Sequence, residues 1–126
     1  MIGSNKLVAF VATTDGSRAR QFYGEVLGLK VISDDPYAVV CDAGGTLLRI
    51  QKVGSLQAQG FTVLGWEVAD IKATVDGLAK RGAKFERYDG MGQDEWGIWE
   101  APSGARVAWF KDPDGNTLSL TQSQRT

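Results

Sequence analysis

An internal repeat constrains the fold of this 126-residue chain more than any single motif does. Val8 lies in an apolar stretch rich in β-forming residues, and Asp15 follows it. The same pair returns 55 positions later as Val63 and Asp70. In both copies the stretch reads as a strand, and the aspartate can cap the helix that the following apolar spacing predicts. The chain is therefore expected to hold two modules that each begin with a strand and a helix.

Later landmarks repeat at a longer offset. Asp42 and Gly45 return as Asp112 and Gly115, 70 positions further along the chain. The difference, 70 − 55 = 15 residues, falls in the second copy between its second strand and this turn. Strands are predicted over residues 6–13, 29–33, 37–42 and 46–53, and again over 61–68, 83–88, 98–112 (a hairpin) and 116–122.

The resulting element order is β-α-β-β-β in each module, so we assign the chain to the α+β class, as a single domain over residues 1–126. Module one covers about residues 6–53, a Gly- and Gln-rich linker covers about 54–60, and module two covers about 61–122. One such module leaves one face of its sheet uncovered, so two modules must pair. We expect two curved mixed sheets around a cleft, with one helix per module on the outer face.

The composition excludes several classes of function. The chain has no histidine, which excludes Ser-His-Asp and Cys-His catalysis within one chain. Its net charge of −1 gives no field that would attract nucleic acid or an anionic membrane. No apolar run is long enough to span a membrane, and the N-terminus lacks the pattern of a signal peptide. Cys41 is the only cysteine, so no disulfide can form within the chain, and it is predicted to be a buried thiol. Because no export signal is recognised either, we expect a cytoplasmic protein.

The stretch "DPDGN" resembles the start of a calcium loop, because Asp112, Asp114 and Asn116 alternate. An EF-hand loop that began at Asp112 would need glycine at its sixth position and glutamate at its twelfth. Thr117 and Ser123 occupy those positions. The three polar residues are therefore interpreted as turn formers.

Three segments in this order carry a family resemblance: "FYGEVLGLKV", "GWEVADIKATVDGLAKRGAKF" and "AWFKDPDGNTLSL". Together with the internal repeat, they make the chain similar to the vicinal-oxygen-chelate superfamily over about residues 6–121. This is the group of glyoxalase I, bleomycin-resistance proteins and extradiol dioxygenases. The resemblance implies the fold and does not select one reaction, because function depends on the site.

In the metal enzymes of that superfamily, one divalent ion lies in the cleft and polarises oxygens of the substrate. Its ligands come from the first and last strands of the modules. Carried over by position, the four ligand positions are Val8, Arg49, Val63 and Ser119. Two of these side chains are aliphatic, one is cationic and one is a weak neutral ligand, whereas divalent ions need carboxylate, imidazole or thiolate ligands. We therefore expect no metal and no other cofactor.

Strand alternation predicts a cleft that is partly aromatic, with one arginine and one glutamate, as is typical of small-molecule sites. The residues predicted to line it are Phe10, Arg49, Glu67, Trp96, Trp99, Trp109 and Ser119. Two alternatives remain open here. Arg49 could pair with Glu67 or Glu100 instead of a ligand. Trp109 could pack in the core or in a dimer contact.

The four ligand positions favour a metal-free protein of the bleomycin-resistance type, which sequesters a small aromatic or amphipathic molecule. Its expected partners are that molecule and a second copy of the chain in a homodimer, with no nucleic acid and no membrane. No catalytic residue is assigned. The alternative is a metal-dependent lyase, isomerase or dioxygenase of the same superfamily with a non-standard ligand set. A third possibility is a module whose cleft is vestigial and filled by side chains.

Overall fold

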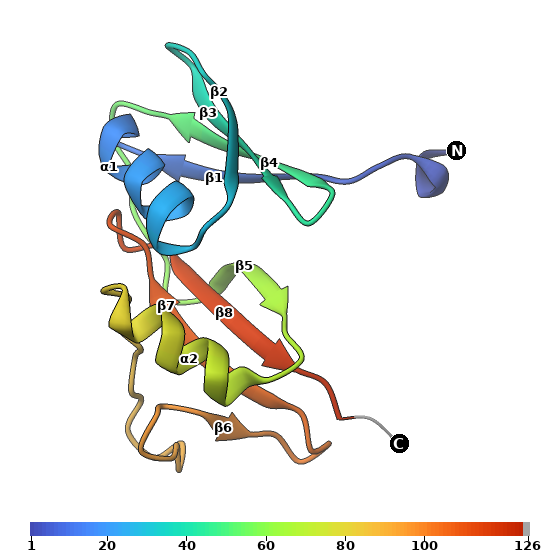
Figure 1. Ribbon diagram of the computed structural model, residues 1–126, viewed down its shortest axis with the longest axis vertical. Helices are drawn as coiled ribbons and strands as arrows, with labels where there is room; N and C mark the ends of the chain where they lie inside the picture. The colour runs from blue at the N-terminus through green and yellow to red at the C-terminus, as the bar shows by residue number, and fades with distance from the viewer. Residues whose placement is uncertain (125–126) are drawn as a thin grey trace. The chain divides into compact units, whose positions relative to one another are not determined.

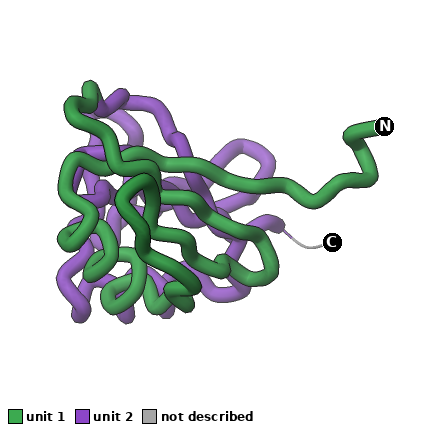
Figure 2. The backbone as a smooth tube through the Cα atoms, turned by 90° about the horizontal axis from the view of Figure 1, so that it is seen from above, with its two compact units in different colours: residues 1–57 green, residues 58–126 purple. Residues whose placement is uncertain are grey.

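The boundary between two compact units lies between Gln57 and Ala58 in the computed structural model of this protein, which describes residues 1–124. Figure 2 shows the two units in different colours. The boundary falls within the stretch 54–60, where the sequence predicts a linker.

Unit 1 contains a four-stranded sheet with the order β1-β4-β3-β2 (Figure 1). Its strands are β1 (Val8–Thr13), β2 (Lys30–Asp34), β3 (Ala38–Ala43) and β4 (Thr46–Lys52), and a short 3-10 helix η1 (Ile2–Ser4) precedes them. β1 runs parallel to β4, whereas β3 pairs antiparallel with both β2 and β4. The sheet is therefore mixed, as the β-α-β-β-β order requires.

The helical segment of unit 1 follows β1 directly. Asp15 caps α1 (Gly16–Gln21), because its carboxylate accepts a hydrogen bond of 3.1 Å from the Arg18 backbone N–H. The chain then continues as a π-helical turn η2 (Phe22–Val26), closed by a 2.9 Å bond from the Leu27 N–H to the Phe22 carbonyl. Gly28 ends the segment with a φ of +77°, a conformation that glycine adopts without steric cost.

Unit 2 repeats this architecture with a sheet of order β5-β8-β7-β6, in which β5 runs parallel to β8. Its elements are β5 (Thr62–Glu67), α2 (Ile71–Lys80), β6 (Trp99–Glu100), β7 (Arg106–Lys111) and β8 (Thr117–Gln122). Asp70 caps α2 through a 3.1 Å bond from the Ala73 N–H, which is the counterpart of the Asp15 cap. The two four-stranded mixed sheets with one helix each confirm the predicted α+β class and the repeat.

The "DPDGN" stretch forms the tight turn between β7 and β8. Asp112 is 6% exposed, and its Oδ1 accepts hydrogen bonds of 2.9 Å from the backbone N–H groups of Asp114 and Asn116. Its Oδ2 accepts another bond of 2.8 Å from the Asn116 side-chain amide. Gly115 completes the turn with a φ of +86°. The Asp112 carboxylate is thus fully engaged within the turn, in agreement with the interpretation of these residues as turn formers.

The strand predicted over residues 83–88 is wrong. Only Phe85 forms a β-bridge, with Phe110, and β6 is two residues long where a full hairpin arm was predicted. One backbone bond of this region reaches β7, from the Glu86 N–H to the Trp109 carbonyl at 2.8 Å, whereas the Tyr88 N–H donates to the side chain of Gln93 at 2.7 Å. A side chain within the loop thus takes the place of a neighbouring strand.

Each sheet is buried against its own helix on one face. In unit 1, α1 contacts β3 and β4, where Leu48 and Ile50 are fully buried. In unit 2, α2 contacts β7 and β8, where Phe110 and Leu118 are fully buried. The opposite side of each sheet is called its helix-free face below. Neither helix in residues 1–124 has the length and apolarity that crossing a bilayer would take.

Candidate functional site

The four superfamily ligand positions all lie on helix-free faces. Val8 and Arg49 alternate with the buried residues of β1 and β4. Val63 alternates with the half-buried Leu64 and Trp66 on β5, and Ser119 alternates with Leu118 and Leu120 on β8. None of the four carries a carboxylate, imidazole or thiolate. Within residues 1–124, no three His, Cys, Asp or Glu side chains gather closely enough to hold a metal ion. The residues present therefore do not fit the divalent ion of the superfamily's metal enzymes, and no chemical step is routed through one.

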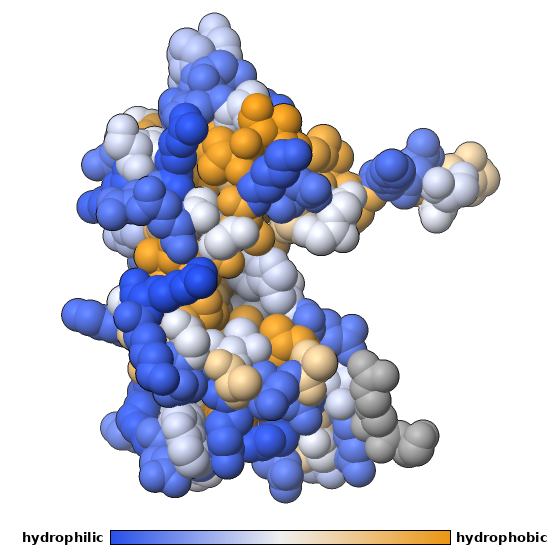
Figure 3. Space-filling view, viewed as in Figure 1, coloured by the Kyte–Doolittle hydropathy of each residue, from blue (hydrophilic) through white to orange (hydrophobic). Residues whose placement is uncertain are grey.

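Phe10 and Arg49 are neighbours on the helix-free face of unit 1, where β1 pairs with β4. The Phe10 ring is 52% exposed. Among residues 1–57, no carboxylate forms an ion pair with Arg49. The pKa of Asp35 is lowered chiefly by hydrogen bonds from two backbone N–H groups, and the charge of Arg49 adds to this effect. The guanidinium is thus available within its own unit. Figure 3 shows apolar surface gathered over the strands of unit 1 on the face in view.

Three aromatic rings meet on the helix-free face of unit 2. The Trp109 ring on β7 lies 6.0 Å from the Trp99 ring on β6, with an angle of 36° between their planes. Tyr88 meets the same indole edge-on, with 5.6 Å between ring centroids and an angle of 83°. All three side chains are half-buried. These residues, the aromatic cluster, form a platform of the kind that stacks on flat ligands.

Polar groups border the aromatic cluster on the same face. Ser119 lies directly opposite Trp109 in the β7–β8 pairing and is 9% exposed. Gly65 is its neighbour on β5, and a Cβ added there would meet the Ser119 Oγ at 2.7 Å. Glu67 lies two residues further along β5 and accepts a 2.9 Å hydrogen bond from the Ser123 hydroxyl. The cluster is therefore flanked by a hydroxyl and a carboxylate.

Tyr88 is the one titratable member of the aromatic cluster. Burial against the indole raises the pKa of its hydroxyl above the ordinary value of 10.0, and the carboxylate of Glu86 raises it further. The phenol therefore stays neutral at physiological pH and can donate a hydrogen bond. No local pattern singles out Tyr88, because its position depends on the path of a long loop.

The loop from residue 86 to residue 98 positions Tyr88 and leads into Trp99, and two of its side chains organise it. The Gln93 amide donates to the carbonyls of Glu86 and Gly97 at 3.0 and 2.8 Å, and its oxygen accepts from the Tyr88 N–H. Asp94 Oδ1 accepts 2.9 Å bonds from the N–H groups of Trp96 and Ile98. The loop is thus cross-linked internally.

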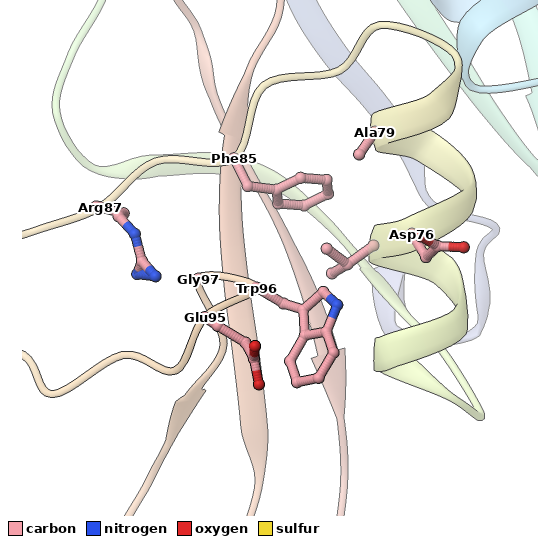
Figure 4. A pocket seen from close by; sticks show the side chains of 8 residues that line it. Asp76, Ala79, Phe85, Arg87, Glu95, Trp96 and Gly97 are labelled. Carbon is pink, nitrogen blue, oxygen red and sulfur yellow. The ribbon is translucent and has the colours of Figure 1, made fainter.

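Trp96 lies apart from the aromatic cluster, on the helix side of unit 2. The Lys72 ammonium sits 4.2 Å from the centroid of the Trp96 ring, so the indole faces α2. The same indole lines a pocket together with Val75 and Phe85 (Figure 4). Of the seven predicted site residues, Glu67, Trp99, Trp109 and Ser119 share the helix-free face of unit 2. Phe10 and Arg49 share that of unit 1, and Trp96 lies on neither face.

Comparison with known protein families places the sequence in one of them. Residues 6–120 match the family model described as Glyoxalase/Bleomycin resistance protein/Dioxygenase superfamily. A search of curated proteins gave no match.

Solved structures with the same fold include three that cover almost the whole chain. A superfamily member from Sphaerobacter thermophilus DSM 20745 has a TM-score of 0.75 and 23% identity, and the match covers 98% of this chain and 100% of that one. The bleomycin resistance determinant encoded on transposon Tn5 has a TM-score of 0.75 and 18% identity, with 97% and 100% covered. TioX from Micromonospora sp. ML1 has a TM-score of 0.73 and 20% identity, with 96% and 100% covered. With the family match over nearly its full length, the chain belongs to the glyoxalase/bleomycin resistance protein/dioxygenase superfamily.

Proposed function

We propose that this protein binds a small planar aromatic or amphipathic molecule without the help of a metal ion. The observation that carries the proposal is the aromatic cluster, in which Trp109 contacts both Trp99 and Tyr88 on a helix-free sheet face. Flat rings stack on aromatic side chains, and the three rings of the cluster are only half-buried, so part of their surface is open to a ligand. Sequestration of the molecule, rather than its conversion, is the proposed role.

Polar groups on the same face as the aromatic cluster would orient the bound molecule. Ser119 and Glu67 on the same face can hydrogen-bond to a ligand hydroxyl, amide or amine. An apolar platform with a few polar groups is the usual composition of a small-molecule site.

The family supports binding as a class of function. One of the solved structures with this fold is a bleomycin resistance determinant, and bleomycin is therefore a reasonable first compound to test. Val8, Arg49, Val63 and Ser119 offer no carboxylate, imidazole or thiolate ligand, which supports a role that needs no divalent ion.

The test is a titration of the purified protein with bleomycin and a panel of planar aromatic antibiotics, followed by tryptophan fluorescence and thermal shift. Replacing Trp109 with Leu should weaken binding about 5- to 150-fold, because stacking on an indole contributes about 1–3 kcal/mol. Trp66→Phe is the matched control, since Trp66 stacks on Phe110 on the helix side of the sheet. Trp99→Phe tests the same platform with a smaller change.

Three outcomes would contradict the proposal. No response to any compound would indicate a vestigial site. Equal losses in Trp109→Leu and Trp66→Phe would show that the effect is not local to the aromatic cluster. A stoichiometric divalent metal in unchelated protein, with binding lost on treatment with EDTA, would favour the metal-dependent lyase, isomerase or dioxygenase.

A further inference from the structure

A separate pocket of about 260 Å³ lies on the helix side of unit 2, away from the aromatic cluster. Val75 and Ala79 of α2 form one wall, and Phe85 and Trp96 form the other. Figure 4 shows the Phe85 ring pointing toward α2 with the Trp96 indole beneath it in this view. The volume is close to the lower end for ligand pockets, so it suits a molecule of about one ring.

Three charged residues also line this pocket, and two of them are already engaged. The Asp76 carboxylate forms an ion pair of 2.9 Å with Lys80. The Arg87 guanidinium donates two hydrogen bonds to the carbonyl of Asp94. Glu95 forms neither a hydrogen bond nor an ion pair with any residue between positions 1 and 124. Glu95 is therefore the pocket carboxylate that has no partner within residues 1–124, whereas Arg87 keeps its positive charge because the Asp94 carbonyl is neutral.

The Trp96 ring already binds a cation within the protein. Lys72, one helical turn before Val75 and Asp76, places its ammonium 4.2 Å from the ring centroid. An indole is the best of the aromatic side chains for this interaction. Lys72 is exposed, so its ammonium can return to water when another cation takes its place.

We propose that this pocket is a second small-molecule site, which takes a compact organic cation. The apolar part of the ligand rests on Val75, Ala79 and Phe85. Its ammonium group replaces that of Lys72 on the Trp96 ring and pairs with the carboxylate of Glu95. This site is independent of the proposed function, because it uses no residue of the aromatic cluster.

The experiment is a titration of ¹⁵N-labelled protein with benzylammonium, following the indole N–H signals of its four tryptophans. The Trp96 signal is assigned by its loss in Trp96→Phe. The Trp96 signal should shift selectively, with a Kd on the order of 1 mM for so small a ligand. Benzoate and benzyl alcohol, of matched shape but different charge, should bind at least tenfold more weakly.

Substitutions at two exposed residues test how charge affects the affinity for benzylammonium, and neither disturbs the core. Lys72→Met removes the competing ammonium and should tighten benzylammonium binding several-fold. Glu95→Gln removes the paired charge and should weaken it several-fold. If Lys72→Met weakened binding or left it unchanged, or if benzoate or benzyl alcohol bound as well as benzylammonium, the proposal would be wrong. A shift confined to the Trp99 and Trp109 signals would also overturn it, since that would place the ligand on the aromatic cluster.

Discussion

Gly65 lies on the helix-free face of unit 2 at a position with little room for a side chain. A Cβ at this position would lie 2.7 Å from the Ser119 Oγ and 3.4 Å from the Ser119 carbonyl oxygen. The first distance is shorter than real Cβ contacts, whereas the second is ordinary van der Waals contact, so the Ser119 side chain must rotate or the two strands must move apart. We expect Gly65→Ala to lower the free energy of unfolding by about 1–3 kcal/mol, as overpacking usually does. Urea unfolding followed by circular dichroism measures the change.

Two further variants separate overpacking from a general effect of replacing glycine. Gly77→Ala is the control, because a Cβ there meets nothing within 4 Å in the interior of α2. It should stabilise the protein by about 0.5–1 kcal/mol. Ser119→Ala removes the nearer clashing atom and should recover part of the loss. A Gly65→Ala protein as stable as wild type would contradict this prediction and show that the Ser119 side chain makes room for the methyl group without cost.

Tyr88 allows a pH-dependent prediction at the same scale. Burial and the nearby Glu86 raise the pKa of its hydroxyl above 10.0, so the folded state favours the neutral phenol. A group with a raised folded-state pKa stabilises the fold below its unfolded pKa, and this contribution is lost as the pH rises through the folded-state pKa. The difference in tyrosinate absorbance between wild type and Tyr88→Phe should therefore show a midpoint above 10.0. A midpoint at or below that value would contradict the burial of Tyr88 against Trp109.

Among the elements, the loop from residue 86 to residue 98 decides where the aromatic residues lie. Gln93 is its central residue, since its side chain makes three hydrogen bonds, to Glu86, Tyr88 and Gly97. Removing these partners leaves part-buried backbone groups unpaired, which costs about 1–3 kcal/mol. We expect Gln93→Ala to reduce stability by that amount and to weaken the near-ultraviolet circular dichroism of the tryptophans.

Gln93→Glu tests the acceptor and donor roles of the Gln93 amide separately. It keeps the acceptor for the Tyr88 N–H but sets a carboxylate oxygen against the carbonyls of Glu86 and Gly97, so its stability should be no higher than that of Gln93→Ala. Full retention of the tryptophan signal in Gln93→Ala would show that the loop is held by Asp94 alone.

Local signals in the sequence predicted most elements but not this loop. Asp15 and Asp70 were identifiable as caps because the capping contact spans only three residues. The two-residue period of the β8 leucines also indicates a strand, and Leu118 and Leu120 are both buried. These features depend on short-range geometry.

The aromatic positions depend instead on contacts that no local pattern specifies. Residues 83–88 look like a strand by composition, yet their partners are Gln93 and one bridge to β7. Trp96 and Trp99 are three residues apart and equally aromatic. The Asp94 turn nevertheless directs Trp96 toward Lys72, whereas β6 carries Trp99 to Trp109. For the same reason the contact of Tyr88 with Trp109 could not be predicted.

At the scale of the whole molecule, the repeat produces two modules whose sheets each have one face that no helix covers. Each sheet is covered by one helix, and the opposite face needs another covering layer. In unit 1 that face carries three exposed apolar side chains: Val8 is 40%, Phe10 52% and Leu47 43% exposed. Apolar groups gathered on one face usually mark a surface that another protein layer covers.

We therefore expect the protein to form a homodimer through the helix-free face of unit 1. Sedimentation velocity over a range of concentrations should show a reversible dimer, and Phe10→Asp should shift it toward the monomer because a buried unpaired carboxylate is costly. Ile2→Asp is the matched control, since Ile2 is 86% exposed in η1, outside the sheet. A wild-type protein that stays monomeric at every concentration would contradict the expectation. Equal effects of the two substitutions would show that net charge, and not the helix-free face of unit 1, controls association.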